Sequence, residues 1–377
     1  MKTSNTSLDS GAQQQARSVL GGRLSSPVTE SVDQLYEHYF PPVPAYEGLP
    51  SELHAFVHTD TESRRKQLNE LRGNHQEYGR FLHSCLGEIY TNIFGYHDGP
   101  SASVPDDDLE VAMFSARIQL EREVLTHWLP FPDVPRFENQ ETAADYLDEL
   151  ADTNAGVHHP LFDYLATDAP RENLDMFLRG ETIRNEIVDD EVALLTVGLQ
   201  GTQKAVVAAN LWDECGRGKL ENFHTFWLRR LIEASPGGWE GFADYRSSHP
   251  WFAKITSNTN AMLLTRPAYV QQAYGCFLIF ESWVAPHFRK ILAAMDRLHI
   301  HDDDIRIYFA AHVAVDPRHA EELADGLRFQ RPRMTPEEIH KVVQGAHLAA
   351  EAGRIQYDHW LSFFTGQPLY KGKDSSV

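Results

Sequence analysis

The chain has 377 residues, of which 42% are hydrophobic and 11% aromatic, so it can bury a sizeable core. Its net charge of −20 at pH 7 argues against partners that need a basic surface, such as nucleic acid or anionic lipid. Three widely spaced cysteines, no leader sequence and no apolar run of bilayer length predict a cytoplasmic protein without a membrane partner.

The N-terminal part of the chain divides into two predicted segments. Residues 1–30 are polar and lack periodicity, which predicts a disordered lead-in. Residues 31–144 predict a helical extension, because apolar residues recur at helical spacing from 51 to about 94 and again from 109 until Pro130 ends the pattern. No alternating strand pattern occurs along the chain, so the predicted fold class is all-α.

The main body is predicted over residues 145–365, followed by a flexible tail at 366–377. Helical patterns cover 140–154, 158–181, 189–199, 203–214, 220–234, 267–298, 299–327 and 336–364. Gly216-Arg217-Gly218 predicts a break in this series, and 235–242 and 245–252 predict connecting loops. The run 267–298 is apolar on most faces, which predicts a buried helix kinked near Pro286.

The most informative pattern is His312-Val-Ala-Val-Asp316-Pro-Arg-His319, with the spacing H-x3-D-x2-H. On a helix, positions four and seven residues further on return to within roughly 40° of the first, so these side chains share one face. Imidazole and carboxylate ligands suit iron, manganese or zinc in a helical protein. Pro317 lies inside the pattern and predicts a kink or local unwinding at this point.

Three further residues are candidates to join this motif. Glu214 follows the apolar pair Leu211 and Trp212, His224 lies among aromatic residues, and Glu281 lies in an otherwise apolar run. Burying a lone carboxylate is costly unless it is paired or binds a cation, so Glu281 is the most informative of the three. Without further context, Glu214 is also compatible with an exposed helix end, His224 with a hydrogen-bonded core histidine, and Glu281 with an ion pair to Arg289 or another cation.

The order of these residues resembles the haem-oxygenase-like diiron oxidase and oxygenase family, also described as iron-containing redox enzymes. The resemblance rests on a Glu ten residues before a His and a second Glu about thirty residues before H-x3-D-x2-H. It also includes the flanking stretches HHPLFDYLA, FLRGE and NLWDECGRG. It covers roughly residues 145 to 365 and implies a haem-oxygenase-like helical bundle with an N-terminal helical extension.

Carried over by position, the resemblance implies that six residues hold two Fe(II) ions that react with O2: Glu214, His224, Glu281, His312, Asp316 and His319. Some relatives use a seventh carboxylate, for which the candidates here are Glu181, Glu186, Asp189 and Asp190. The implied reaction is N-oxygenation of an amino-acid-like amine, giving a hydroxylamine or nitro product in a biosynthetic pathway. Oxidative C–C cleavage or desaturation of a fatty or amino acid is the alternative. Electrons would come from a separate donor, and a homodimer through the N-terminal helices is a further option.

Other classes of protein are also compatible with parts of the pattern. A ferritin-like bundle would use Glu221-x-x-His224 and Glu337-x-x-His340, but it would leave His312, Asp316 and His319 without a role. A haem-binding or cofactor-free member of the same fold would not need the acids Glu214 and Glu281. A non-catalytic helical binding protein would leave Glu281 unexplained.

Overall fold

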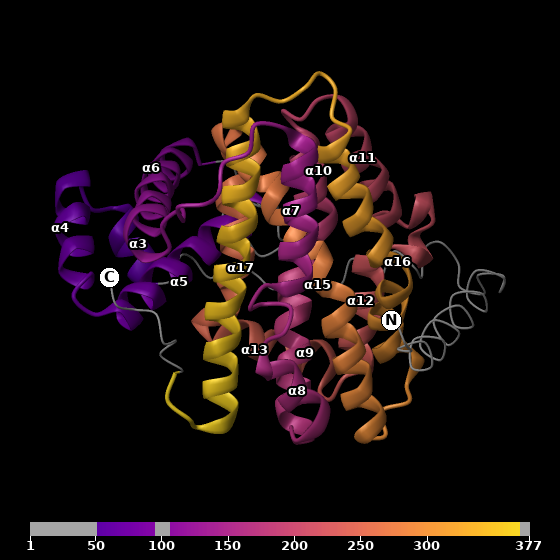
Figure 1. Cartoon of the computed structure of the whole chain (residues 1–377). Coiled ribbons are helices and arrows are strands. Elements are labelled where there is room, and N and C mark those ends of the chain that lie inside the picture. The colour runs from indigo at the N-terminus through magenta and orange to yellow at the C-terminus, as the bar shows by residue number, and fades with distance from the viewer. Residues whose placement is uncertain (1–50, 95–105, 370–377) are drawn as a thin grey trace.

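The computed structural model describes residues 51–94 and 106–369, and throughout these ranges the chain forms helices joined by turns and loops, with no strand (Figure 1). The all-α prediction is confirmed. The predicted lead-in 1–30, the start of the extension and most of the tail 366–377 lie outside the described residues. Among the described residues, no helix combines the length and apolar character needed to cross a membrane.

The helices fall into an extension and a core. The extension comprises α3 (Ser51–Val57), α4 (Thr61–Leu71), α5 (His75–Ile93), α6 (Asp107–Glu123) and the π-helical turn η1 (Val124–Trp128). The first half of the core comprises α7 (Gln140–Thr153), α8 (Pro160–Thr167), α9 (Arg171–Asn185), α10 (Val188–Thr196), α11 (Gly201–Glu214) and α12 (His224–Ala234). The second half comprises α13 (Gly238–Ser248), α14 (Ile255–Leu264), α15 (Val270–Arg297), α16 (Asp303–Arg328) and α17 (Pro336–Thr365). Short 3-10 turns η2 (Gly216–Gly218), η3 (Leu220–Asn222), η4 (Trp251–Lys254) and η5 (Pro267–Tyr269) connect them.

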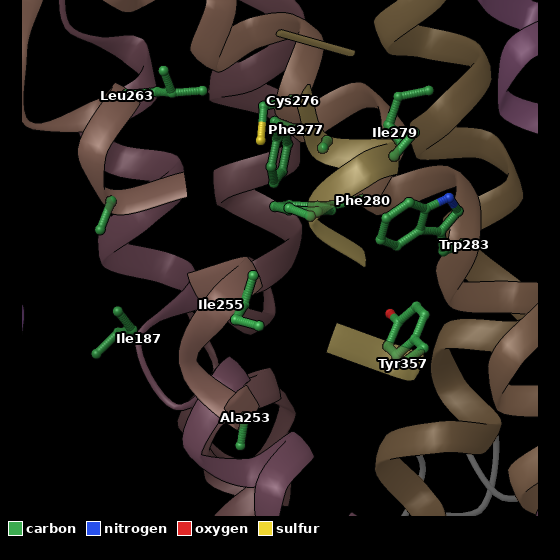
Figure 2. Packing of buried hydrophobic residues seen from close by; sticks show 14 of the residues in the cluster. Ile187, Ala253, Ile255, Leu263, Cys276, Phe277, Ile279, Phe280, Trp283 and Tyr357 are labelled. Carbon is green, nitrogen blue, oxygen red and sulfur yellow. The ribbon is translucent and has the colours of Figure 1, made fainter. Parts of the chain in front are cut away.

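The long helix α15 lies at the centre of the bundle, packed between α16 and α17 (Figure 1). Its contact with α17 is close because two glycines face backbone: a Cβ at Gly275 would lie 1.9 Å from the Val342 carbonyl oxygen, and one at Gly345 would lie 1.9 Å from that of Gln272. Large side chains fill the surrounding core, including Phe277, Phe280 and Trp283 (Figure 2). The helix is continuous through Pro286.

The extension packs on one side of this bundle through α5, which contacts η4 and α14 (Figure 1). A buried carboxylate joins the two parts, because Glu121 of α6 accepts hydrogen bonds from Tyr90 at 2.8 Å and from Arg266 at 3.0 Å. The predicted boundary between residues 144 and 145 falls inside α7, and α7 packs against α15, α16 and α17 of the core.

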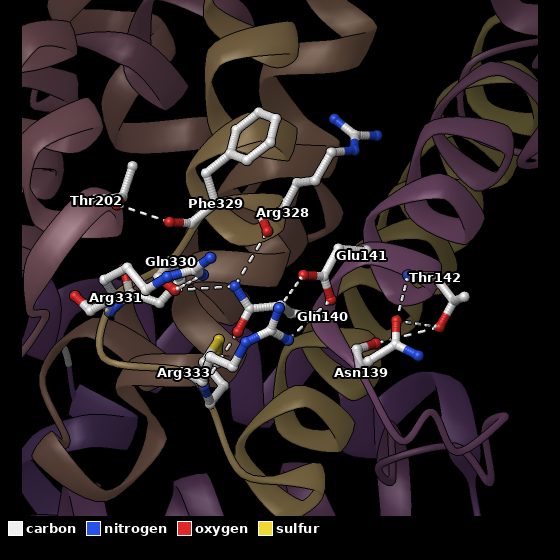
Figure 3. Close-up of polar contacts among 11 residues, drawn as sticks. Asn139, Gln140, Glu141, Thr142, Thr202, Arg328, Phe329, Gln330, Arg331 and Arg333 are labelled. Carbon is white, nitrogen blue, oxygen red and sulfur yellow. Dashed lines mark hydrogen bonds and ion pairs between the residues drawn. The ribbon is translucent and has the colours of Figure 1, made fainter.

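The loop that follows α16 is fixed by polar contacts from two other helices (Figure 3). The Gln140 side chain, at the start of α7, donates to the carbonyl oxygens of Arg328 and Gln330 at 3.1 and 3.0 Å. Thr202, at the start of α11, donates to the carbonyl oxygen of Phe329 at 3.1 Å. These bonds hold the C-terminal end of α16 in place.

One expectation about local structure is wrong, and a second is wrong in part. The predicted loop segments 235–242 and 245–252 include a helix, α13, whose Phe242 and Tyr245 pack against Ile183 and Ile232 in a separate apolar cluster. The helix α16 continues through Pro317 instead of unwinding there.

Candidate metal centre

A tight turn brings Glu214 and His224 together. Glu214 is the last residue of α11 and His224 is the first of α12. Between them, Gly216 adopts a left-handed φ of +54°, and a Cβ at this position would lie 2.5 Å from the carbonyl carbon of Asn222. A backbone bridge between Cys215 and Phe223 closes the turn. The predicted break at Gly216-Arg217-Gly218 is therefore present, and it places the two helix ends side by side.

His312 of α16 completes a buried cluster with these two residues. One ligand atom of each of Glu214, His224 and His312 lies within 4.8 Å of the others, and it is the one such group found among the described residues. The Nδ1 atom of His224 lies 2.7 Å from Oε2 of Glu214, and the rings of His224 and His312 are 4.3 Å apart. All three residues are at most 5% exposed.

Glu281 and His319 form an adjacent pair. The two side chains are 7% and 0% exposed, and Oε2 of Glu281 lies 3.6 Å from Nδ1 of His319. His319 is close enough to the first cluster for its charge to act on Glu214 and on both histidines there. The structure thus brings five of the six predicted ligands into one buried region. Asp316 lies on the same helix, α16, but its side chain is outside the described residues.

Hydrogen bonds orient two of the imidazole rings. The Nδ1 atom of His312 lies 2.6 Å from the carbonyl oxygen of Tyr308. A carbonyl can only accept, so Nδ1 carries the proton and Nε2 presents its lone pair. In His319, Nε2 lies 3.3 Å from Oδ2 of Asp213, which assigns the proton to Nε2 and leaves Nδ1 facing Glu281. Such bonds from the outer nitrogen fix the tautomer of a metal-binding histidine.

The electrostatics of the cluster favour uncharged imidazoles. Burial lowers the pKa of His224 to about 3, and the charge of His319 adds to this shift. Burial likewise lowers the pKa of His312 to about 3, with a further contribution from His224. Both rings are therefore neutral near pH 7, the form that binds a metal. Burial raises the pKa of Glu214, and electrostatic interaction with the neighbouring His312 and His319 partly opposes the rise.

The donor set fits a first-row metal ion. The facing atoms Oε2 of Glu214 and Nδ1 of His224 are buried, and neither makes a hydrogen bond to any described residue. Buried polar atoms without partners are rare in folded proteins and call for an explanation such as a bound ion. Two ligands bound at about 2.1 Å and at right angles to one another lie about 3 Å apart, close to the separation seen here. Carboxylate oxygen with imidazole nitrogen is a ligand set suited to iron.

The four candidates for a seventh carboxylate occupy different surroundings. Glu186 forms an ion pair with Arg246, and Asp190 is exposed. Burial, followed by the charges of Asp190 and Glu214, raises the pKa of Asp189 to about 6, so Asp189 lies near the cluster. Glu181 lines a cavity together with Glu281. Asp189 is therefore the candidate near the first cluster, and Glu181 lies beside the cavity that Glu281 also lines.

Two openings meet at Glu281. A surface groove of about 590 Å³ between α7, α15 and α16 includes Glu281 in its lining, together with further acids and the arginines Arg289 and Arg328. On the inner side, a cavity of about 70 Å³ is bounded by Glu281, by Glu181 of α9 and by aromatic side chains. Glu281 is therefore the predicted ligand that lines both the groove and the cavity.

Asp213 is a functional candidate that the sequence reasoning missed. Its carboxylate accepts hydrogen bonds from Arg217 at 2.6 Å, from Arg318 at 2.5 Å and from His319. Burial opposes the ionisation of Asp213, but these bonds outweigh burial and hold its pKa below the usual range. The available signal was the i, i+4 spacing of Asp213 and Arg217, whereas the contact with His319 spans 106 residues and depends on the fold.

The ferritin-like alternative is not supported by these positions. Glu221 lies in the turn η3, before the first residue of α12, so it does not share a helix with His224. Glu337 faces solvent and pairs with Arg136 at 3.5 Å. His159, which follows His158 directly, caps α8 by accepting a hydrogen bond from the amide of Leu161.

A helical bundle with buried carboxylate and imidazole ligands defines the class of metal-dependent helical proteins. Residues 175–354 match the model of a family described as iron-containing redox enzyme. Over this range the match confirms the resemblance to iron-containing redox enzymes that the sequence indicates.

Two solved structures of a CadD-like protein of unknown function from Nostoc punctiforme are similar to the chain. The first is 15% identical, with a TM-score of 0.48, over 60% of this chain and 98% of that one. The second is 14% identical, with the same TM-score of 0.48, over 61% of this chain and 98% of that one. No curated protein matches the sequence.

Proposed function

We propose that the chain is a non-haem diiron oxygenase that uses O2 to oxidise the nitrogen of an amino-acid-like amine. The observation that carries this proposal is the buried group of Glu214, His224 and His312, whose facing polar atoms have no hydrogen-bond partner among the described residues. Its place in a domain of the iron-containing redox enzyme family supports iron as the metal.

The residues that would hold iron form two neighbouring groups. Glu214, His224 and His312 make up the first, and Glu281 and His319 the second. Asp316, four residues after His312 on α16, is the sixth ligand that the resemblance implies. Two ferrous ions bound there would supply electrons for the stepwise reduction of O2, which closed-shell side chains cannot do.

The chain itself orients the ligands and keeps water away. The Tyr308 carbonyl and the Asp213 carboxylate hold the outer nitrogens of His312 and His319, so both rings keep their direction when a metal binds. Trp227 stacks on His224 at 5.0 Å and covers this ligand with an apolar ring. The carboxylates at the inner cavity, Glu181 and Glu281, favour an amine over an acid as the molecule that approaches.

The reaction requires electrons from outside the chain. Conversion of an amine to a hydroxylamine places one oxygen atom of O2 on nitrogen, and the second leaves as water after uptake of two electrons and two protons. A separate reductase or a chemical reductant must supply these electrons.

The proposal is tested by anaerobic Fe(II) titration, followed by exposure to O2, a reductant and a panel of amino acids and amines. We expect two irons per chain, and with the correct amine a product heavier by one oxygen atom that carries label from ¹⁸O2. A chain that binds no iron would refute the proposal. Iron-dependent loss of a carbon unit from a fatty or amino acid would replace N-oxygenation by C–C cleavage.

A further inference from the structure

The cavity beside Glu281 contains a carboxylate that has no partner. Glu181 of α9 lines this cavity, and its side chain makes no hydrogen bond or ion pair with any described residue. Burial raises the pKa of Glu181 to about 7, and the nearby Arg184 only partly opposes the shift. A half-buried acid of this kind gains most from a ligand that brings a positive charge.

The cations and histidines around the cavity do not supply that charge. Arg184 is the basic residue in the wall, and it pairs with Glu191 at 3.0 Å while lying over the ring of Phe280. His287 also lines the cavity, but burial lowers its pKa to about 3, so its ring is neutral near pH 7. With Glu281 on the same wall, the lining retains a surplus of negative charge.

Aromatic rings form the rest of the wall. Phe280 and Trp283 lie 5.3 Å apart, and Trp283 lies 5.9 Å from Tyr357 of α17, around a common space (Figure 2). The faces of such rings attract ammonium and guanidinium groups, and the attraction is strongest where water is excluded. A carboxylate together with several aromatic rings is therefore suited to a cation and unsuited to an anion.

The size of the cavity indicates which part of a ligand it holds. Its volume is about 70 Å³, and by the same measure a single water needs at least about 10–15 Å³. The space accommodates a few waters or the end of a chain, not a complete drug-sized molecule. The remainder of a larger ligand would extend out of the cavity.

We propose that this cavity is the subsite for the cationic end of the substrate, an alkylammonium or guanidinium group held between Glu181 and the rings of Phe280, Trp283 and Tyr357. The assignment rests on the proposed function in one respect, namely that Glu281 marks the end of the cavity nearest to iron. It makes the substrate a basic amine and makes Glu181 a binding residue.

The surroundings of Glu181 distinguish this role from that of an iron ligand. After burial, the charge of Glu181 is the largest cause of the raised pKa of Tyr245, and it also raises that of Tyr357. The groups that shift the pKa of His224 are instead His319, Glu281 and Asp213. Glu181 therefore acts mainly on the aromatic side of the cavity, away from the cluster.

The subsite is tested by calorimetric titration of metal-free full-length protein with n-butylammonium, butan-1-ol and butyrate. We expect n-butylammonium to bind at least about tenfold more tightly than butan-1-ol, because one partner of a desolvated ion pair is already in place. Butyrate should not bind measurably. E181Q, which keeps the shape of the side chain but removes its charge, should abolish the preference for the cation. E181A, which removes the side chain beyond Cβ, should abolish it as well.

Matched measurements separate the possible roles. E172Q removes an exposed carboxylate from the same helix and should keep the preference of the wild type. E181Q should still take up two irons. Loss of an iron in E181Q would show that Glu181 is a metal ligand and would refute the subsite. A preference for the cation that survives in E181Q would also refute it. Wild-type protein that takes up two irons but shows no preference also refutes the subsite alone. Wild-type protein that prefers the cation but takes up no iron refutes the diiron oxygenase alone.

Discussion

The buried carboxylate of Glu214 should favour iron binding but destabilise the metal-free protein. Its carboxylate is 3% exposed, and burial raises its pKa, so ionised Glu214 destabilises the metal-free folded state at pH values above the ordinary pKa of glutamate. We predict that E214Q stabilises the metal-free protein by on the order of 1–2 kcal/mol, because a neutral amide replaces a desolvated charge. The same change should remove at least one iron. Chemical denaturation and metal analysis measure the two effects.

The control for E214Q is E221Q, which alters a half-buried acid in the adjacent turn η3. We expect E221Q to leave iron uptake unchanged, because Glu221 belongs to the ferritin-like pattern that the fold does not form. Should E214Q lower stability and retain both irons, the carboxylate would instead be the structural partner of His224, 2.7 Å away.

Asp213 should act on iron through His319. Its hydrogen bond fixes the ring so that Nδ1 faces Glu281, and partners of this kind typically contribute a factor of about 10–100 to metal affinity. We predict that D213N weakens the binding of one of the two irons by that factor and leaves helical content unchanged. Titration with Fe(II) under anaerobic conditions gives the affinity of each site.

A matched control for D213N is D175N. Asp175 also pairs with an arginine at i, i+4 spacing, Arg171, but it lies on α9 outside the cluster. Equal effects of the two substitutions on iron affinity would show that Asp213 acts only through the net charge of the protein and not through its hydrogen bond to His319.

At the scale of the element, the turn between α11 and α12 sets the separation of the first two ligands. Gly216 has a φ of +54°, and an added Cβ would lie 2.5 Å from the backbone of Asn222. We predict that G216A costs at least about 3 kcal/mol, since both backbone strain and a steric clash must be relieved. It should also weaken iron binding by moving Glu214 away from His224. Urea denaturation and iron titration test the two parts.

Gly366 provides the comparison for this turn. It has a similar φ of +67°, but an added Cβ would meet no atom within 4 Å. G366A should therefore cost only about 1 kcal/mol, the strain of a left-handed alanine, and should leave iron binding intact. A similar loss in both variants would mean that the close contact at Gly216 is relieved by a small shift of the chain.

The long amphipathic or apolar helices could be predicted from periodicity, and α13 shows where this reasoning stops. Its segment contains Gly237, Gly238 and Gly241, which indicate a loop, yet Trp239, Phe242 and Tyr245 recur every three residues. Phe242 and Tyr245 bury against Ile183 and Ile232, and this packing outweighs the low helix propensity of glycine. The helical spacing could be seen in the sequence, but the surface formed by Ile183 and Ile232, against which these side chains pack, could not be predicted from it.

The candidate site, like the fold, could be predicted from the sequence only in part. The order of Glu214, His224, Glu281 and H-x3-D-x2-H could be recognised because the ligands lie in short, ordered motifs. Asp213 and Glu181 could not be assigned, because their roles depend on which side chains surround them. A carboxylate becomes a positioning group or a cation-binding group only through partners from other helices.

At the scale of the whole molecule, a buried histidine lies where the extension meets the core. His83 of α5 is 0% exposed, and Asn258 of α14 donates a 2.9 Å hydrogen bond to its carbonyl oxygen. Trp128 and Trp251 flank its ring. Burial, and to a lesser extent the charge of His359, lowers the pKa of His83 to about 3. The contact between the two parts of the chain therefore requires a neutral imidazole.

This requirement makes the stability of the molecule depend on pH. Between about pH 6.5 and pH 3, the unfolded chain binds a proton at His83 and the folded chain does not, so acid favours unfolding. One proton corresponds to about 1.4 kcal/mol per pH unit. We predict that the difference in unfolding free energy between the wild type and H83Q shrinks by about that amount for each unit from pH 6 to pH 4. Urea denaturation of metal-free protein measures it, and H158Q, at an exposed histidine, should show no such trend. A constant difference between wild type and H83Q would mean that His83 is protonated in the folded state, and that the junction of extension and core accommodates its charge.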